Sequence, residues 1–222
     1  MSAHPTVVSV HALDAGGGEG LVADAQVFSE LDCRAVCVAT GVLPSVPLSP
    51  GLLRGQLDAA QRSAAIGAVR TGFVKGVEQV ALLGEFIGSA APERTVISWS
   101  ALDEQTREAM LREVVPKARV VVARASQTSI EGLCAFAKEL RDRGARAVLV
   151  AGMVARGRVI DFLDDGGAVV LLDTARIQAG RVEGLAGAHA AALAAHLARG
   201  LTLPQASEAA QRYVGFRLRR GR

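Results

Sequence analysis

The densest group of residues that could do chemistry lies near the start of the chain. Gly16, Gly17, Gly18 and Gly20 surround Glu19 directly after an apolar run that is typical of a β-strand. Glycines at the carboxyl end of a strand let the backbone approach a ligand closely, and the amides of the helix that follows favour an anion. The run lacks both the Gly-Lys-Ser/Thr of a phosphate-binding loop and the spacing of the dinucleotide fingerprint. A tight turn that binds nothing has the same composition, so both interpretations stay open.

The elements that must position this loop follow a regular alternation of short apolar runs and segments of helical period. We predict strands at 6–10, 34–40, 68–71, 95–98, 119–123 and 146–151, and helices at 21–31, 51–66, 77–87, 103–115 and 129–143. Thr128 and Glu131 form a capping box before the last of these helices. Two further strands, 158–162 and 169–173, are joined by a turn at 164–167, and helices at 188–199 and 204–217 follow. The pattern predicts a single domain over residues 1–222, with a mainly parallel sheet between helices.

Composition and charge narrow the class of protein. Half of the 222 residues are hydrophobic, and no apolar run reaches the length of a membrane span, so we expect a cytoplasmic protein without a membrane partner. The four arginines of the last six residues carry more positive charge than the whole net charge of +3, so the rest of the chain is slightly acidic. The sequence contains no basic stripe that would predict nucleic-acid binding. Cys33 and Cys37 share one face of an expected strand, where we predict buried thiols and neither a disulfide nor a metal site.

Three segments carry a resemblance to a known family. Residues 14–28 resemble the pattern S-D-x-S-G-G-A-G-I-Q-A-D-x-K-x-F of hydroxymethylpyrimidine/phosphomethylpyrimidine kinases, which belong to the ribokinase superfamily. Residues 68–74 are similar to V-K-I/T-G-M-L, and residues 184–200 to G-T-G-C-T followed by A-A-N-L-A-K-G. The resemblance covers nearly the whole chain, in order. It implies a ribokinase-like three-layer sandwich, a central mostly parallel sheet with helices on both faces.

The resemblance also implies a site and its ligands. The family transfers phosphate from ATP, with magnesium, to a pyrimidine of the thiamine pathway, and its members are commonly homodimers. For this chain it implies a small aminopyrimidine-like ligand in a cleft at the carboxyl ends of the parallel strands. The substrate side would comprise Asp14, Gly17, Gly18, Glu19, Thr40, Ser45 and Phe73; the nucleotide side Ser98, Gly152 and Gly184; and the catalytic turn Gly184, Ala186 and Gly187.

The departures from the family pattern fall on the chemistry. Gly187 stands where the family has the Cys beside the acceptor hydroxyl, and it has no side chain that could take a proton. Ser98 replaces an Asp near the metal and phosphates, and a Lys-bearing loop after that strand is missing. Ser45 replaces the residue that reads the pyrimidine amino group. We therefore predict a phosphomethylpyrimidine kinase-like protein whose kinase activity is weak or lost. The alternative is a non-catalytic relative that binds a small ligand or a protein partner.

Two further side chains have alternative interpretations. His189 lies two residues after Gly187 and could replace the missing base, but a histidine on an alanine-rich helix is more often structural. Glu19 occupies the position of the alanine that backs the pyrimidine ring in the family. Its carboxylate could contact an amino group of the ligand, or it could be a solvated residue at a helix start, which we favour.

Overall fold

In the part of the chain that the structure describes, nine strands form one open sheet in the order β3-β2-β1-β4-β5-β6-β7-β8-β9. The computed structural model describes residues 4–43, 46–63, 65–99, 102–126, 129–178 and 184–220. Neighbouring strands from β2 to β7 run parallel, whereas β3, β8 and β9 pair antiparallel. The strands are β1 (Thr6–Leu13), β2 (Arg34–Val42), β3 (Val46–Pro47), β4 (Ile66–Thr71), β5 (Thr95–Trp99), β6 (Val120–Arg124), β7 (Val148–Ala155), β8 (Arg158–Asp164) and β9 (Val169–Ala175).

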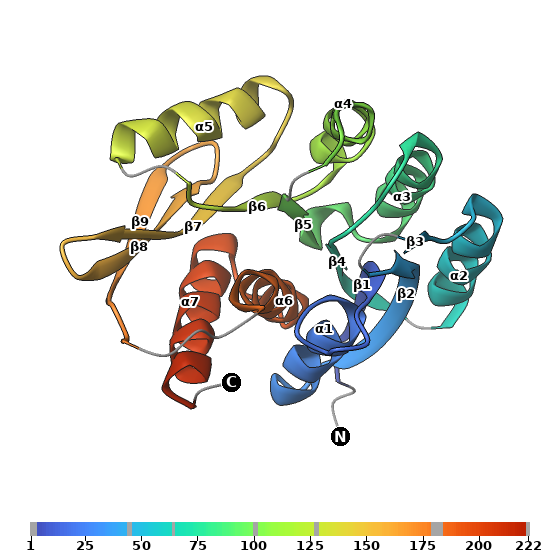
Figure 1. Cartoon of the computed structure of the whole chain (residues 1–222), viewed down its shortest axis with the longest axis horizontal. Coiled ribbons are helices and arrows are strands. Elements are labelled where there is room, and N and C mark those ends of the chain that lie inside the picture. Colours follow the sequence, from blue (N-terminus) through green and yellow to red (C-terminus); the bar gives the residue numbers. More distant parts are fainter. Residues whose placement is uncertain are drawn as a thin grey trace.

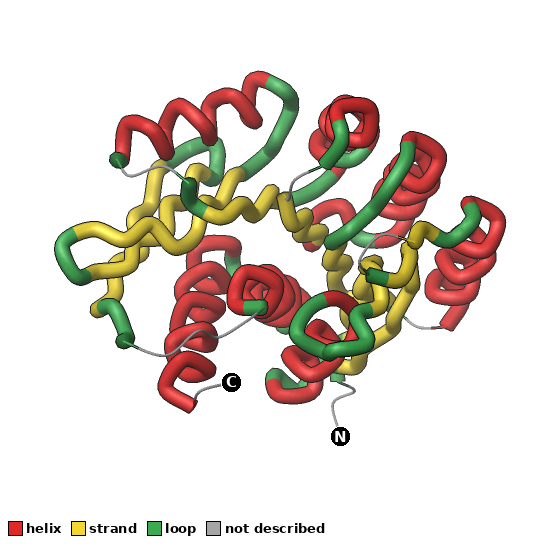
Figure 2. The backbone as a smooth tube through the Cα atoms, viewed as in Figure 1, coloured by secondary structure: helices red, strands yellow, loops and turns green. Residues whose placement is uncertain are grey.

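Helices cover both faces of this sheet (Figures 1 and 2). One face carries α2 (Pro50–Ser63), α3 (Val77–Ala90), α4 (Glu104–Glu113) and α5 (Ile130–Asp142), and the other α1 (Gly20–Glu30), α6 (Leu185–Ala198) and α7 (Leu203–Arg220). Short 3₁₀ turns at Pro92–Arg94 and Val115–Lys117 lead into β5 and β6. Each face has its own hydrophobic core, so the expected three-layer arrangement is confirmed.

The central strands read as unbroken apolar runs because both of their faces are covered. In β1, Val8 packs into the core under α2 to α5, and Val7 packs into the core under α1 and α6; both are fully buried. A strand buried on both sides gains apolar burial at every position, which removes the polar alternation of a one-sided sheet.

Several predicted boundaries were wrong, for identifiable reasons. The helix predicted at 51–66 ends at Ser63, because Ile66 already belongs to β4 and pairs with Thr6. Thr128 lies outside the described residues, and the cap of α5 is instead Ser129, whose side chain accepts a hydrogen bond from the amide of Gly132 at 3.2 Å. The helices predicted to begin at 188 and 204 begin at Leu185 and Leu203.

The prediction for the cysteines was half wrong. Cys33 is buried, but it lies in the turn before β2 and not within the strand, whereas Cys37 is exposed. The strand alternation therefore does not extend back to Cys33. Among the described residues, no group of three or more His, Cys, Asp or Glu side chains is placed to hold a metal ion.

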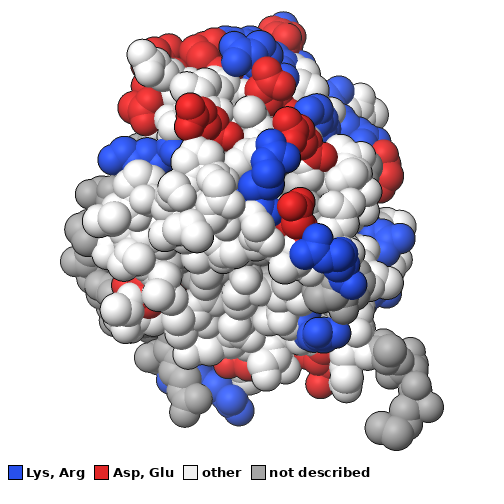
Figure 3. All heavy atoms as spheres, turned by 90° about the vertical axis from the view of Figure 1, so that its right-hand side faces the viewer, with Lys and Arg blue, Asp and Glu red and all other residues white. Residues whose placement is uncertain are grey.

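Charged side chains are distributed unevenly over one side of the molecule. Figure 3 shows the right-hand side of Figure 1, where charged residues gather in the upper part above a broad uncharged area. Val42, Val46 and Leu52, from β2, β3 and α2, are 40%, 64% and 61% exposed, and we call these three residues the apolar face. Within the described ranges, no helix is both long and apolar enough to cross a membrane.

Candidate functional site

A cleft of about 1180 Å³ opens at the carboxyl ends of the parallel strands. This is the edge of an open α/β sheet at which ligands usually bind. The cleft is lined by residues from the ends of β1, β4, β5, β6 and β7, by the loop before α1, and by the first turn of α6; it continues between β9 and α7.

The glycine loop between β1 and α1 forms one wall. Both carboxylate oxygens of Asp14 accept hydrogen bonds from the loop backbone, from the amides of Gly16, Gly18 and Glu19, each at 3.0 Å. The amides of Glu19 and Gly16 hold the pKa of Asp14 below its usual value, against a small opposing effect of desolvation. Asp14 therefore shapes the loop, and its oxygens are already engaged.

The turn that begins α6 also lines the cleft and lies directly against the glycine loop. Gly184 is the N-cap of α6 in the left-handed conformation, with φ 71°. A Cβ on Gly184 would lie 2.0 Å from the carbonyl oxygen of Gly18. The two glycine motifs, more than 160 positions apart in the chain, thus meet backbone to backbone at the cleft. As a glycine, the N-cap residue itself has no side chain that could cap the helix start.

The floor of the cleft holds a buried ion pair. The Arg70 guanidinium, on β4, has its Nε 3.3 Å from Oδ2 of Asp24, and both side chains are at most 2% exposed. Ser9 donates a hydrogen bond of 2.5 Å to the same oxygen. Burial raises the pKa of the Asp24 carboxyl, while Arg70 and Ser9 oppose that shift. The pKa of Arg70 is lowered by burial, which Asp24 and Glu19 partly offset.

His11 lies beside Arg70 at the end of β1. Its Nδ1 accepts hydrogen bonds from the amides of Ala12 at 2.7 Å and Phe73 at 3.4 Å. Burial, with the nearby charge of Arg70, holds the pKa of His11 well below its usual value, so the ring is neutral near pH 7. With Nδ1 as acceptor, the ring carries its proton on Nε2.

A second buried pair lines the cleft nearer to β8. Nε2 of His189 lies 3.8 Å from Oδ2 of Asp161, and the other oxygen of Asp161 accepts a hydrogen bond of 2.7 Å from the amide of Gly152. Burial lowers the pKa of His189, and Asp161 opposes that shift. His189 thus reaches the cleft, in a position where its Nε2 faces a carboxylate.

The structure gathers most of the predicted site residues in this one cleft. Its lining includes Asp14, Gly18, Glu19, Phe73, Ser98, Gly152, Gly184, Ala186 and Gly187. Gly17 and Thr40 are not in the lining. Gly17 turns the loop at φ 70°, and the buried Thr40 donates a hydrogen bond of 2.6 Å to the carbonyl of Phe73, so it acts behind the wall. Ser45 lies outside the described residues.

Sequence reasoning did not single out several side chains of the cleft, among them His11, Arg70, Trp99 and Asp161. The available signals were a histidine at the end of β1 and a charged residue inside the apolar run of β4. The polarity of a single position does not reveal which partner compensates it, because Asp24 is supplied by another element.

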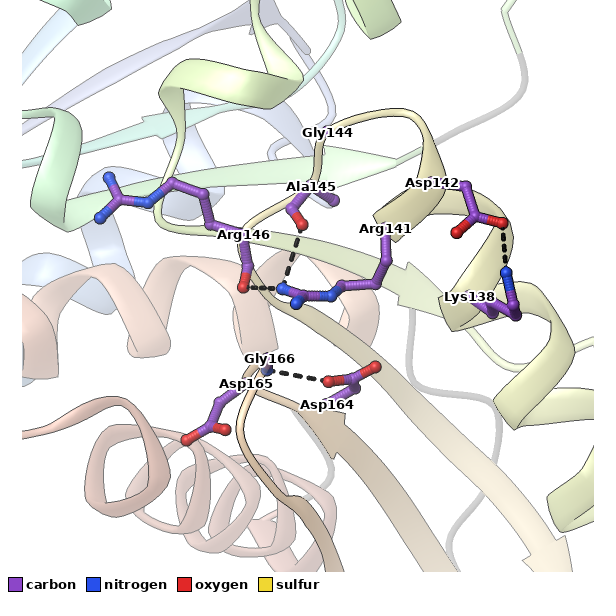
Figure 4. Close-up of a pocket in the computed structure, with 9 residues that line it drawn as sticks. All are labelled: Lys138, Arg141, Asp142, Gly144, Ala145, Arg146, Asp164, Asp165 and Gly166. Atoms are coloured by element: carbon purple, nitrogen blue, oxygen red, sulfur yellow. Dashed lines mark hydrogen bonds and ion pairs between the residues drawn. The ribbon is translucent and has the colours of Figure 1, made fainter.

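A second hollow, of about 800 Å³, lies between α5 and the turn that joins β8 to β9 (Figure 4). Its charged groups are engaged with one another or with the backbone. Arg141 donates to the carbonyls of Ala145 and Arg146, and Lys138 pairs with Asp142 at 2.6 Å. These contacts explain the charges of this hollow without a ligand.

Comparisons with known proteins identify the family of the chain. The family model for phosphomethylpyrimidine kinase matches residues 14–221. A putative pyridoxine kinase of Treponema pallidum is 26% identical over 97% of this chain and 91% of its own length. A hydroxymethylpyrimidine/phosphomethylpyrimidine kinase of Rhizobium meliloti is 28% identical, over 93% of this chain and 88% of its own length.

A solved structure has the same overall fold. The pyridoxal kinase of Staphylococcus aureus, in complex with AMP-PCP and pyridoxal, superposes with a TM-score of 0.89 at 25% identity, covering 98% of this chain and 88% of that one. The fold is therefore ribokinase-like. Because the family model spans almost the full length, the chain belongs to the phosphomethylpyrimidine kinase family.

Proposed function

We propose that this chain binds a small vitamin-like ring, of the aminopyrimidine class, in the cleft, and that it transfers phosphate weakly or not at all. The observation that carries the proposal is the environment of Gly187. This residue stands in the first turn of α6, where the family resemblance calls for the side chain that activates the acceptor hydroxyl. The nearest atom to a Cβ placed there would be Nη2 of Arg70, at 3.6 Å. A cation at this point cannot accept the proton of a hydroxyl group.

The nucleotide half of the cleft supports the same proposal. Kinases bind magnesium through one or two carboxylates together with the phosphates. Ser98 and Gly152 line this half, and the carboxylate beside them is Asp161, which already accepts from Gly152 and faces His189. The described residues therefore fit ATP–magnesium poorly, and we derive no step of transfer through it. Removal of one positioned acid or base typically costs about 10²–10⁴-fold in rate.

The test is an ADP-release assay on the parent and on Gly187→Cys, with hydroxymethylpyrimidine and its phosphate as acceptors. We expect parent turnover at or below roughly 0.1 s⁻¹, because even a hundredfold loss reduces a typical turnover of about 10 s⁻¹ to that level. Parent turnover above about 1 s⁻¹, an ordinary kinase rate, would refute the loss of activity. If neither protein is active, the defect also includes the nucleotide half.

A second candidate function is that of an active kinase for pyridoxal-type vitamins. It is favoured by the likeness to the Staphylococcus aureus pyridoxal kinase and by a relative named as a putative pyridoxine kinase. Pyridoxal and pyridoxine therefore belong in the same assay as additional acceptors. Turnover with these and not with the pyrimidines would establish this candidate.

The proposal includes a homodimer. The apolar face offers three exposed hydrophobic side chains, of which Val42 and Val46 pair across β2 and β3. Covering such side chains by a second copy would remove apolar area from water. Light scattering of the purified protein, beside Leu52→Glu, tests this: a monomeric parent would contradict it.

A further inference from the structure

The part of the cleft nearer to β8 and α7 contains a buried polar pair for which the proposed function has no role. Asp161 on β8 and His189 on α6 are 2% and 4% exposed, and both line the cleft. Within the described part of the chain, Nε2 of His189 has no hydrogen-bond partner. The residue stands in a stretch of α6, from Ala188 to Ala195, that is otherwise buried alanine and leucine. Because a buried nitrogen without a partner is costly, this one calls for an explanation.

A β-bulge holds the carboxylate of Asp161 in place. The pairing of β7 with β8 shifts its register between Val150 and Met153, and Asp161 lies opposite the two residues between them. Gly152, one of these two, has φ 87° and donates its amide to Oδ1 of Asp161 at 2.7 Å. Bulges of this kind re-aim side chains and are frequent beside functional sites. The other carboxylate oxygen, Oδ2, is the one that faces His189.

The gap between the two side chains has room for a single oxygen atom. Nε2 of His189 lies 3.8 Å from Oδ2 of Asp161, too far for a direct hydrogen bond. Hydrogen bonds to oxygen are about 2.7–2.9 Å long, so an oxygen beside the line between the two atoms lies within bonding distance of both. Burial lowers the pKa of His189, and the neutral ring directs its proton on Nε2 toward the carboxylate. A hydroxyl group accepts and donates, and it therefore satisfies both side chains at once.

The walls around this pair are mainly apolar. Val159, on the same face of β8 as Asp161, lines the cleft together with Val214 and Leu218 of α7. The amide side chain of Gln211, also on α7, is engaged, because its Nε2 donates a hydrogen bond of 2.8 Å to a backbone carbonyl of β9. A molecule bound against these walls gains most by burying an apolar body.

The negative charge of the pair limits what can bind between its members. Asp161 brings a carboxylate that the neutral His189 does not offset, so an anionic group placed there would be repelled. Arg124 also lines the cleft, but it is exposed at the end of β6, and β7 lies between that strand and β8. The pair therefore favours an uncharged hydroxyl group over an anion.

We propose that Asp161 and His189 bind the hydroxyl group of a small uncharged molecule whose apolar body lies against β8 and α7. The hydroxyl donates to Oδ2 of Asp161 and accepts from Nε2 of His189. The inference goes beyond the proposed function, because it assigns a second ligand to the part of the cleft where the family resemblance calls for a nucleotide. The ligand's chemical class is a neutral alcohol, and no phosphate takes part in its recognition.

Titrations with three matched probes, followed by saturation-transfer NMR, test this. Benzyl alcohol donates and accepts, benzyl methyl ether only accepts, and toluene does neither. We expect the parent to bind the alcohol at least about tenfold more tightly than the ether, because the ether lacks the hydrogen bond to a carboxylate. The ether should bind about threefold more tightly than toluene, because it still accepts from His189. Equal affinities for the alcohol and the ether would overturn the inference, as would displacement of the alcohol by ATP–magnesium.

Two variants locate the two hydrogen bonds. Asp161→Asn keeps an oxygen for the amide of Gly152 and presents its own amide donors to the ligand, so the preference for the alcohol over the ether should fall below about threefold. His189→Leu fills a similar volume without a polar atom and should remove the preference for the ether over toluene. Asp142→Asn, at an exposed aspartate of α5, is the matched control and should behave as the parent does. A folded variant of either pair member that keeps the parent's preference would overturn the inference.

The outcomes are separable from those of the kinase assay. Parent turnover above about 1 s⁻¹, without displacement of benzyl alcohol by ATP–magnesium, would refute the loss of activity and leave the hydroxyl site standing. A parent that is inactive as a kinase but binds the alcohol and the ether equally would refute the hydroxyl site alone.

Discussion

Replacing Gly184 by alanine should separate the two glycine motifs that form the cleft. Gly184 has φ 71°, and a Cβ there would lie 2.0 Å from the carbonyl oxygen of Gly18, whereas ordinary contact begins near 3.4 Å. The variant therefore has two separate energetic costs. The left-handed conformation costs a residue with a side chain about 1–2 kcal/mol, and forcing an extra methyl group against a fixed neighbour typically costs about 1–3 kcal/mol.

A matched control isolates the steric part. Gly200 has φ 88°, but a Cβ there would meet nothing within 4 Å, so Gly200→Ala has the conformational cost alone. In a chain of this size, 1 kcal/mol shifts the melting temperature by roughly 2–4 °C. We expect a decrease of roughly 2–8 °C for Gly200→Ala and roughly 4–20 °C for Gly184→Ala. The entropy that alanine removes from the unfolded chain is the same in both and cancels in the comparison.

The assay is thermal unfolding followed by circular dichroism, with ligand titration as a second measurement. Gly184→Ala should also weaken binding in the cleft, because Gly18 must move for the methyl group to fit, whereas Gly200→Ala should not. Equal decreases in melting temperature for the two variants would refute the reasoning. They would mean that the turn before α6 does not press on the glycine loop.

Two further predictions concern single side chains. Burial lowers the pKa of His189 from 6.5, so the unfolded chain takes up a proton at a higher pH than the folded one. The stability that the neutral ring contributes is present above the unfolded-chain pKa of 6.5 and is lost as the pH falls below it. Urea unfolding at about pH 7.5 and about pH 5.5 should show that the free energy of unfolding falls by at most roughly 1.4 kcal/mol because of this residue, and this loss should be absent in His189→Gln. For Glu19, both Glu19→Gln and Glu19→Ala should weaken binding of hydroxymethylpyrimidine about 3- to 10-fold if the carboxylate contacts its amino group. Unchanged affinity in both variants would assign Glu19 to the solvated start of α1.

The layered fold could be predicted from the sequence because each element carries its own signal. Runs such as that of β6, with consecutive valines, are buried on both faces, and the helices between them keep one apolar side. The turn predicted at 164–167 joins β8 to β9 as expected, with Gly166 at φ 89°. The ends of elements were less predictable, because pairing with a neighbouring strand decides them, as it does for Ile66.

The cleft was only partly predictable. The contact between Gly18 and Gly184 follows from two motifs that the family resemblance places at one site, and the structure brings them together. The floor could not be inferred in the same way. Arg70 is buried because Asp24, on another element, compensates its charge, and His11 is held by backbone amides of its own strand end and of the loop after β4. Such partners are set by tertiary packing, which the type and spacing of residues do not encode.

The missing side chain of Gly187 determines what lies next to the buried guanidinium of Arg70. A cysteine thiol at position 187 would stand next to the guanidinium, since Nη2 lies 3.6 Å from the Cβ position. Such a neighbour lowers the pKa of a thiol and favours the thiolate. The thiolate would then be an internal anion beside the guanidinium of Arg70. Gly187→Cys should nevertheless gain little as a kinase, because the nucleotide half of the cleft still fits ATP–magnesium poorly. With glycine at this position, the charge of Arg70 stays directed toward whatever enters the cleft.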